Sequence, residues 1–226
     1  MSAASNPQQT GEFRIIESAH EIRDGVVALR KACRAMRSIH DLVGDPPLRR
    51  HPAGLEGLAR VVVAQQLSAA SAGAIWTRTR AAIDPFTAET IARQTEASLR
   101  GAGLSQGKIR TLRAIADAIT AGALVLDSEG SRDLPSFRTS LTRVRGVGPW
   151  TADIYTMFCL GHADAFAPGD LALQLAAQSA LRLDARPSPA ELESIAARWR
   201  PWRGVAARLL WSYYAHNKTA QAANRP

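Results

Sequence analysis

The sequence predicts an all-α protein, and three observations lead to that fold class. Alanine is abundant, the alternating β-branched and aromatic residues that mark strands are rare, and apolar residues recur at helical spacing along most of the chain. With 226 residues and 46% hydrophobic residues, the chain is long enough to bury a large core. We therefore expect one compact unit, a two-lobed helical bundle with a cleft between the lobes.

Two helical stretches open the predicted unit. Apolar residues at helical spacing predict a first helix over residues 18–40, which ends at a Pro/Gly-rich break. Residues 54–81 predict a second helical stretch, apolar on almost every side and therefore buried. Gln65 and Gln66 interrupt it with two amides that need hydrogen-bond partners. They either form a satisfied network at a helix junction or point one amide into a site or a DNA duplex.

Shorter helices follow in the middle of the chain. Thr87 is expected to cap a short helix, and Ser105 to cap a helix over residues 107–121 that ends at Gly122. Residues 124–135 are expected to be irregular and residues 136–144 to form another short helix. In the last helix, residues 202–216, Trp211 points almost opposite to the apolar face, so it lies either on a second buried face or on a cleft wall.

Chain boundaries and composition exclude several classes of protein. Residues 1–18 and 218–226 are expected to be flexible ends around a domain of residues 19–217. The first residues lack a signal-peptide pattern, and no run approaches 18 apolar residues, so we expect a cytoplasmic protein with no membrane span. Its two cysteines, Cys33 and Cys159, do not form a C-x-x-C pair and are expected to be reduced thiols rather than metal ligands.

The net charge favours a polyanionic partner. Lys and Arg outnumber Asp and Glu by 28 to 20, which gives a net charge of +8 and an isoelectric point near 10.4. Nucleic acid is the commonest partner of such a surface, and a solvated basic surface without a partner is the plainer interpretation.

A Gly-Val-Gly turn between two helices, over residues 137–160, is the most informative motif. Gly146 and Gly148 allow close backbone approach, and the helix that follows offers free N–H groups and a positive dipole end. Arg143 and Arg145 flank the turn, and Thr151 lies at the helix start. The sequence thus predicts a hairpin that binds DNA phosphates, where carbonyls near Arg145 and Val147 can also hold a Na⁺ or K⁺ ion.

A lone carboxylate, Asp170, stands at the start of the next helix. A simple N-cap after Pro168 and Gly169 is the structural interpretation. The hairpin 20 residues earlier favours a catalytic one, and both roles are compatible. Asp153 and Asp164 are better explained as solvated or structural carboxylates.

Five segments in order resemble the helix-hairpin-helix DNA glycosylase superfamily, and within it the DNA-3-methyladenine glycosylase II family. They are VVVAQQLSAASA at 61–72, GLSQGKIRTLRAIADA at 103–118, VRGVGPWTAD at 144–153, FAPGDLALQ at 166–174 and RWRPWRGVAARLLW at 198–211. The resemblance implies a DNA-binding cleft between the lobes, duplex DNA with damaged bases as partner, no cofactor, and a monomer. In a bacterium the protein would be associated with the nucleoid.

The resemblance also implies roles for individual residues. Asp170 matches the essential carboxylate, which stabilises an oxocarbenium-like transition state and orients or activates water. Trp150 and Trp211 match aromatic pocket positions, while Ile154 stands where the family has a tyrosine, with Tyr155 beside it. Gln66, or Leu67 by a one-residue shift, matches the wedge that fills the space left by a flipped base.

A missing lysine further restricts the predicted reaction. Bifunctional members of the superfamily carry a Schiff-base lysine on the hairpin's second helix, where this chain has Trp150. We therefore expect a monofunctional enzyme that hydrolytically removes alkylated bases, such as 3-methyladenine or 7-methylguanine, and leaves an abasic site. A glycosylase for deaminated or oxidised bases and a non-catalytic helix-hairpin-helix DNA-binding module remain as alternatives.

Overall fold

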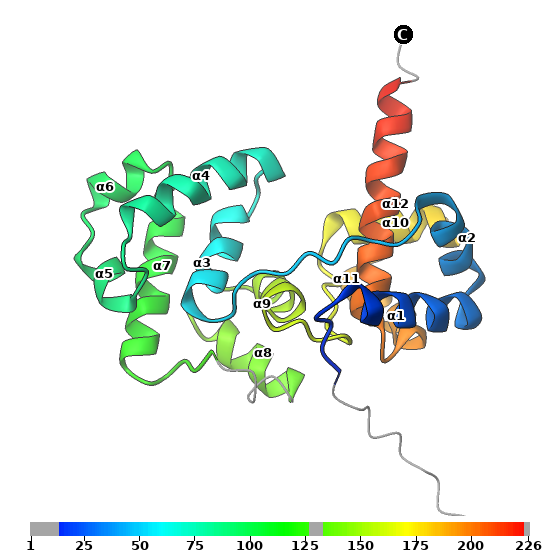
Figure 1. Cartoon of the computed structure of the whole chain (residues 1–226), viewed down its shortest axis with the longest axis horizontal. Helices are drawn as coiled ribbons and strands as arrows, with labels where there is room; N and C mark the ends of the chain where they lie inside the picture. The colour runs from blue at the N-terminus through cyan, green and yellow to red at the C-terminus, as the bar shows by residue number, and fades with distance from the viewer. Residues whose placement is uncertain (1–13, 127–132, 224–226) are drawn as a thin grey trace, which may run out of the picture.

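The fold is all-α, as predicted. The computed structural model describes residues 14–126 and 133–223, and within these ranges it contains helices, turns and one isolated β-bridge between Ile15 and His162, but no β-strand. The helices form two lobes that lie side by side (Figure 1). Two segments without helix, residues 44–53 and 161–170, join them.

The first lobe is built from one uninterrupted part of the chain. In it α7 packs against α5, and α3 packs against α4, α7 and α9. A π-helix, η2, directly continues α9. The elements are α3 (Gly54–Ala64), α4 (Ala69–Ala82), α5 (Ala88–Arg93), α6 (Glu96–Gly101), α7 (Gln106–Thr120), α8 (Leu134–Thr142), α9 (Pro149–Tyr155) and η2 (Thr156–Leu160).

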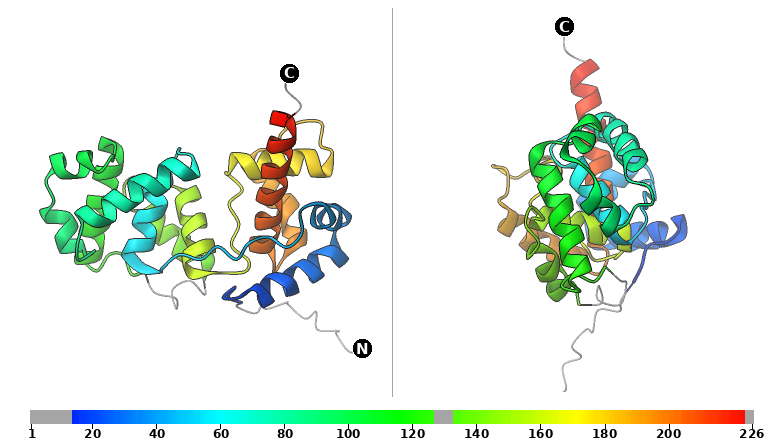
Figure 2. Two further views of the ribbon diagram at one scale, coloured as in Figure 1. Left: turned by 45° about the horizontal axis from the view of Figure 1, so that its top comes forward. Right: turned by 90° about the vertical axis from the view of Figure 1, so that its left-hand side faces the viewer.

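The second lobe combines both flanks of the chain around the long helix α12. This helix packs against α1, α2 and α10, and it extends beyond the rest of the lobe (Figures 1 and 2). The elements are α1 (Ala19–Ala32), α2 (Arg34–Val43), α10 (Leu171–Leu181), α11 (Pro189–Ala196), the 3₁₀ turn η3 (Ala197–Trp199) and α12 (Arg203–Ala223).

Several predicted helix ends are confirmed. The side chain of Thr87 caps α5 by accepting from Thr90 N, and that of Ser105 caps α7 by accepting from Lys108 N. Gly122 follows α7 with a φ of 69°, a left-handed conformation that favours glycine.

The helix predicted over residues 18–40 is in fact two helices. Cys33 breaks it, because its backbone is extended (φ −144°, ψ 116°) and its side chain is buried. Arg37 satisfies the end of α1 by donating from Nε and Nη2 to the carbonyl oxygen of Arg30. The side chain of Arg37 thus supplies the hydrogen bonds that a backbone N–H of the next helical turn would otherwise donate.

The stretch predicted over residues 54–81 is also two helices, α3 and α4, separated by a turn that contains both glutamines. Only α3 is largely buried; on α4 the buried residues are Trp76 and Thr79. The many small apolar residues of α4 made its sequence look like that of a buried helix, but most of them are not buried. Two further helices, α6 and α11, were not predicted, because each is short and lies between turn-forming residues.

The predicted flexible ends are partly wrong. Ile16 is fully buried and donates its N–H to Gly161 O, while Ala163 N donates to Arg14 O, so the ordered unit begins before residue 18. Residues 218–223 continue α12. Residues 1–13 and 224–226 of the predicted ends, and residues 127–132 of the predicted irregular segment, lie outside the described residues.

Both cysteines are free and buried, as predicted. Cys33 lies in the second lobe, and burial raises the pKa of the Cys159 thiol to about 12. Across residues 14–126 and 133–223, none of the helices combines the length and the apolar character needed to cross a membrane.

Candidate active site

Asp170 begins α10 at the end of the segment that joins the two lobes. Its Oδ1 accepts a hydrogen bond from Leu173 N over 3.0 Å, which makes it the N-cap of the helix. Its own N–H donates to Ala167 O, so a tight turn fixes the backbone immediately before the cap. The N-cap and catalytic interpretations of Asp170 are therefore compatible in the structure.

Two indole groups reach the Asp170 carboxylate from opposite lobes. Trp150 Nε1, at the start of α9, donates to Oδ2 over 2.8 Å. Trp211 Nε1, on α12, donates to Oδ1 over 3.0 Å. Both tryptophans are half-buried, and Trp211 thus lies at the junction between the lobes rather than on a second buried face. Asp170 thus forms one cluster with two tryptophans that lie 20 and 41 positions from it in the sequence.

An aromatic wall extends from this cluster. The Phe158 ring lies 5.5 Å from the Trp211 ring, centroid to centroid, and the Arg208 guanidinium lies 4.7 Å from the Phe158 centroid. Phe158 is half-buried and was not predicted as a site residue. The sequence signal for Phe158 was its position about one helical turn after Ile154. However, the π-helix η2 begins between them and changes the number of residues per turn.

Ile154 and Tyr155 were both expected to line the base pocket. Ile154 is 9% exposed and belongs to the core. Tyr155 is fully buried; its hydroxyl accepts from Gly54 N over 2.9 Å, and its ring stacks on Phe137. This placement does not fit the expected role of Tyr155, because a fully buried ring offers no surface to a flipped base.

The hairpin turn joins α8 to α9. Gly146 has a φ of 87°, and a Cβ there would lie 1.9 Å from Thr111 Oγ1, so both conformation and space require glycine. Gly148 is the N-cap of α9, and a Cβ on it would meet nothing within 4 Å. Arg143 and Arg145 are exposed on either side of Val144. The turn therefore presents open backbone and two cations, as the predicted phosphate site requires.

Thr151 has a different position from the one expected. Its side chain is buried, and its Oγ1 accepts a hydrogen bond from Gln65 Nε2 over 2.8 Å. The hydroxyl therefore ties the hairpin to the α3–α4 turn, and the expected phosphate contact does not fit the Thr151 side chain. Of the two glutamines, Gln65 is therefore the one whose amide is hydrogen-bonded within the protein, as one of the two interpretations predicted.

Gln66 and Leu67, the expected wedge residues, lie in the turn between α3 and α4. Gln66 is exposed and has a φ of 56°, an unusual left-handed conformation for a residue other than glycine. Leu67 is 38% exposed, which is high for a large apolar side chain. The bond from Gln65 to Thr151 holds this turn against the hairpin. The side chains of Gln66 and Leu67 are thus exposed to solvent on a turn that is anchored to the hairpin.

Comparison with known proteins identifies the family. A family model described as HhH-GPD superfamily base excision DNA repair protein matches residues 59–201. This range covers more than half of the chain and contains the hairpin and Asp170. The chain belongs to the HhH-GPD superfamily. The resemblance inferred from the sequence motifs is therefore confirmed.

Relatives of this HhH-GPD chain are named as alkylation-repair proteins. A Mycobacterium tuberculosis protein, the probable bifunctional transcriptional activator/DNA repair enzyme AlkA, is 33% identical over 202 residues, which cover 84% of this chain and 40% of that protein. An alkylbase DNA glycosidase-like protein of Schizosaccharomyces pombe is 29% identical over 75% of this chain and 83% of its own length. The chain thus spans about two fifths of the first relative's length.

Solved structures share the same fold. A 3-methyladenine DNA glycosylase of S. pombe in complex with abasic DNA is 26% identical, covers 90% of this chain and 99% of its own, and superposes with a TM-score of 0.77. A DNA-3-methyladenine glycosidase of Bacillus halodurans is 25% identical over 92% of this chain and 94% of its own, with a TM-score of 0.73. An 8-oxoguanine glycosylase/lyase of Clostridium acetobutylicum, 17% identical over 90% of this chain and 71% of its own with a TM-score of 0.67, shows the fold alone.

A buried arginine joins the lobes of this HhH-GPD protein. Arg208 is 3% exposed; it donates to Gly204 O over 2.9 Å and to Met157 O in η2 over 3.1 Å. Burial, together with the positive charges of Arg50 and Arg49, lowers the pKa of Arg208 to about 10. Because Arg208 also packs on Phe158, it supports the aromatic wall from behind.

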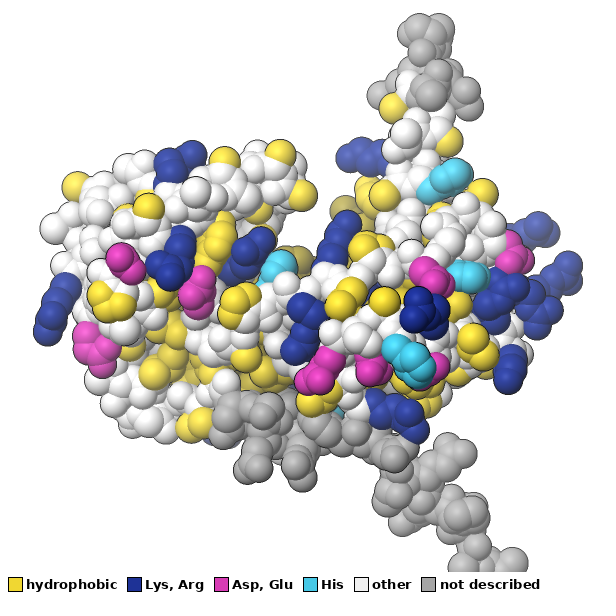
Figure 3. Space-filling model, in the orientation of Figure 1, with side chains coloured by type: hydrophobic (Ala, Val, Ile, Leu, Met, Phe, Trp, Pro, Cys, Tyr) yellow, Lys and Arg dark blue, Asp and Glu magenta, His cyan; other side chains and the backbone are white. Residues whose placement is uncertain are grey.

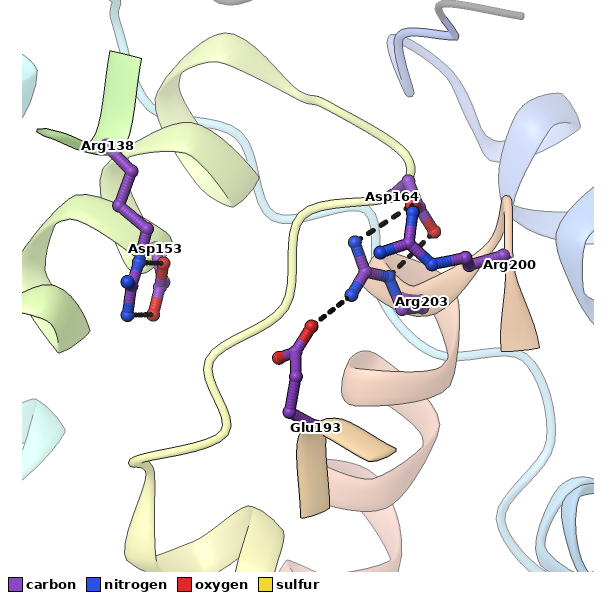
Figure 4. Close-up of polar contacts among 6 residues, drawn as sticks. All are labelled: Arg138, Asp153, Asp164, Glu193, Arg200 and Arg203. Atoms are coloured by element: carbon purple, nitrogen blue, oxygen red, sulfur yellow. Dashed lines mark hydrogen bonds and ion pairs between the residues drawn. The ribbon is translucent and has the colours of Figure 1, made fainter. Parts of the chain in front are cut away.

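A separate cavity of about 650 Å³ is lined by residues of both lobes, but not by Asp170, Trp150 or Trp211. On one wall Arg138 donates to Asp153 over 2.7 Å, and on the other Arg203 binds Asp164 and Glu193 (Figure 4). Burial raises the pKa of Asp153 to about 6, although the pairing with Arg138 acts against it. Asp153 and Asp164 thus have structural partners, as predicted.

Basic side chains lie near the junction of the lobes on the face seen in Figure 3. Lys and Arg side chains occur on both sides of the notch between the lobes, and Asp and Glu side chains lie among them on both lobes. A positive surface at a notch attracts a polyanion over several ångströms and favours a DNA backbone there.

Proposed function

We propose that this HhH-GPD chain is a monofunctional DNA glycosylase that flips and hydrolytically removes alkylated bases, such as 3-methyladenine or 7-methylguanine, from duplex DNA. The observation that carries the proposal is the Asp170 carboxylate, held between two indole N–H groups where the lobes meet and one segment away from the hairpin. The relatives named as 3-methyladenine glycosylases support the same reaction.

The chemistry needs one carboxylate and one water molecule. As the bond between C1′ and the base nitrogen breaks, its electron pair leaves with the base and positive charge develops on the sugar. The Asp170 carboxylate stabilises that charge, and the water oxygen then bonds to C1′ and releases a proton to Asp170 or to solvent. The products are a free base and an abasic site.

An alkylated base suits an aromatic wall. Alkylation at a ring nitrogen makes the base cationic and weakens the glycosidic bond, so that strong acid catalysis is unnecessary. A cationic or electron-poor base stacks well on an electron-rich ring. Trp211, which binds Asp170, and Phe158, whose ring lies 5.5 Å from that of Trp211, supply such rings.

The lysines support a reaction without a Schiff base. The chain contains three, Lys31, Lys108 and Lys218. Lys108 is on α7 and donates from Nζ to Val63 O over 2.6 Å, while Lys31 and Lys218 are on α1 and α12. Trp150 occupies the place of a nucleophilic lysine on α9, so the strand should not be cut.

DNA docks, in this proposal, on the hairpin and on the α3–α4 turn. The backbone around Gly146 and Gly148, with Arg143 and Arg145, binds phosphates. Carbonyls near Arg145 and Val147 would hold a Na⁺ or K⁺ ion, which would supply further positive charge to the phosphates. Gln66 or Leu67 fills the space of the flipped base. The protein acts as a monomer on DNA in the cytoplasm, at the nucleoid in a bacterial cell, and needs no other cofactor.

Base release from methylated duplex DNA tests the proposal. Wild type should release 3-methyladenine or 7-methylguanine, and Asp170→Asn should release neither while it still binds DNA. Asp133→Asn is the matched control, because Asp133 also caps a helix, α8, with its side chain. Release of only uracil, hypoxanthine or 8-oxoguanine would change the substrate class. DNA binding without release of any base would indicate a non-catalytic module.

A further inference from the structure

The Asp170 carboxylate receives three N–H donors from three different elements. Oδ1 accepts from Leu173 N in α10 and from Trp211 Nε1 in α12, each over 3.0 Å, and Oδ2 accepts from Trp150 Nε1 in α9 over 2.8 Å. A carboxylate has about four acceptor sites, two on each oxygen. Among the described residues, Oδ1 is thus fully used and Oδ2 keeps one site for a reactant.

All three donor groups can donate a hydrogen bond but cannot accept one. An indole Nε1–H and a backbone N–H only donate, so all three contacts need an oxygen that accepts. The indole plane is rigid, and Trp211 is further held by Phe158, 5.5 Å away. Either tryptophan could therefore fix the carboxylate's rotation more firmly than a flexible side chain could.

We infer that Trp150 and Trp211 are positioning residues, whose indole N–H groups orient the Asp170 carboxylate and direct the unused site of Oδ2 to the reacting sugar. This inference rests on the proposed function and adds a role to the stacking expected of both rings. The two roles use different parts of the side chain: the ring face stacks on a base, and Nε1 holds the carboxylate.

The two tryptophans also connect Asp170 to both lobes. Trp150 belongs to the first lobe and Trp211 to the second, while Asp170 follows the segment between them. The carboxylate reaches the geometry seen here only when both lobes are correctly placed. A misplacement of a reacting group by about 1 Å can lower a rate by about 100-fold, so the loss of one N–H should slow the chemical step.

Phenylalanine substitutions separate the two roles. Trp150→Phe and Trp211→Phe each keep an aromatic face but lose the N–H. We expect the single-turnover rate of base release to fall by about 10- to 100-fold. The dissociation constant for duplex DNA with an abasic-site analogue should change by less than about threefold. Trp199→Phe is the matched control, because Trp199 Nε1 is buried without a hydrogen-bond partner.

Rates within twofold of wild type in both phenylalanine variants would overturn the inference and leave stacking as the role of the rings. A result in which affinity and rate fall together would also overturn it. Inactivity of wild type on every methylated substrate would instead contradict the proposed function. The comparison of the variants is made only against an active wild type, so the two failures are distinguishable.

A spectroscopic measurement covers the case in which a variant does not fold. In ¹⁵N-labelled protein, the indole N–H signals of Trp150 and Trp211 should shift in Asp170→Asn, whereas that of Trp199 should not. If neither signal moves, the indole groups do not bind the carboxylate and the inference is wrong. This measurement does not depend on activity.

Discussion

Gln65 Nε2 donates a hydrogen bond of 2.8 Å to Thr151 Oγ1, across 86 positions of sequence. The bond joins the α3–α4 turn, which carries Gln66 and Leu67, to the first turn of α9, which follows the hairpin. The α3–α4 turn and the start of α9 are therefore directly connected.

Breaking the bond between Gln65 and Thr151 should reduce both the stability of the protein and its activity. Gln65→Ala and Thr151→Val should each lower the free energy of unfolding by about 1 kcal/mol and reduce base release, since each removes one partner of a partly buried hydrogen bond. In a double-mutant cycle measured by denaturant unfolding, we expect a coupling of about 1 kcal/mol. Thr151→Ser keeps the hydroxyl and should behave like wild type. Additive effects would show that the bond does not couple the two turns.

Replacing Gln66 with glycine should separate stability from activity. Its φ of 56° is strained for glutamine but ordinary for glycine. Gln66→Gly should therefore leave the free energy of unfolding unchanged or raise it by up to about 1 kcal/mol. If the side chain is the wedge, the rate of base release should fall by about tenfold or more under single-turnover conditions. Leu67→Ala distinguishes the two wedge candidates, and an unchanged rate in Gln66→Gly would remove Gln66 from them.

The two hairpin glycines should respond differently to alanine. Gly146→Ala introduces a Cβ that overlaps the Thr111 side chain at a positive φ, and it should destabilise the protein by about 2 kcal/mol or more. The Gly148→Ala methyl meets open space, so its thermal midpoint should change little. If the DNA backbone approaches there, the affinity for DNA should nevertheless fall. Equal melting temperatures in both variants would contradict this assignment.

His162 should make stability depend on pH. Burial lowers the pKa of His162 to about 4, and its Nδ1 accepts a hydrogen bond from Asp164 N, which requires an unprotonated nitrogen. Because the folded pKa lies below the unfolded one, the stabilisation is present above about pH 6.5 and is lost as the pH falls towards 4.

The matched variant is His162→Asn, whose side-chain oxygen can replace Nδ1 as an acceptor. From pH 7 to pH 4, wild type should lose about 3 kcal/mol of unfolding free energy relative to this variant. Asp153 acts in the opposite direction, since its raised pKa gives stability that is lost as the pH rises through about 6. It is present in both proteins, so it cancels in the difference. Parallel stability curves would contradict the prediction for His162.

Local patterns identified most of the helices and the catalytic candidate. Helical spacing, the caps at Thr87 and Ser105, and the Gly-Val-Gly turn are properties of neighbouring residues, so a sequence shows them directly. The break at Cys33 depends on a contact from Arg37 back to Arg30 O, and the role of the Thr151 hydroxyl depends on Gln65. Such contacts exist only after packing.

The same limit explains the errors in the base pocket. Tyr155 follows Ile154 directly, and in sequence either could replace the family's tyrosine. Only the packing of α9 and η2 shows that Tyr155 faces the core, where its hydroxyl binds Gly54 N, and that Phe158 of η2 lies beside Trp211. The contacts of both indoles with Asp170 join residues 20 and 41 positions apart, a distance that no local pattern encodes.

The division of the chain between the lobes has a consequence for its synthesis. Residues 54–160 leave the ribosome as one run and contain everything that the first lobe needs, whereas α1 and α2 must wait for α12. Their apolar faces stay uncovered during most of translation, a state that favours association with chaperones. Trp211 emerges late, on the last helix, so a nascent chain forms the hairpin turn well before Trp211 can bind Asp170.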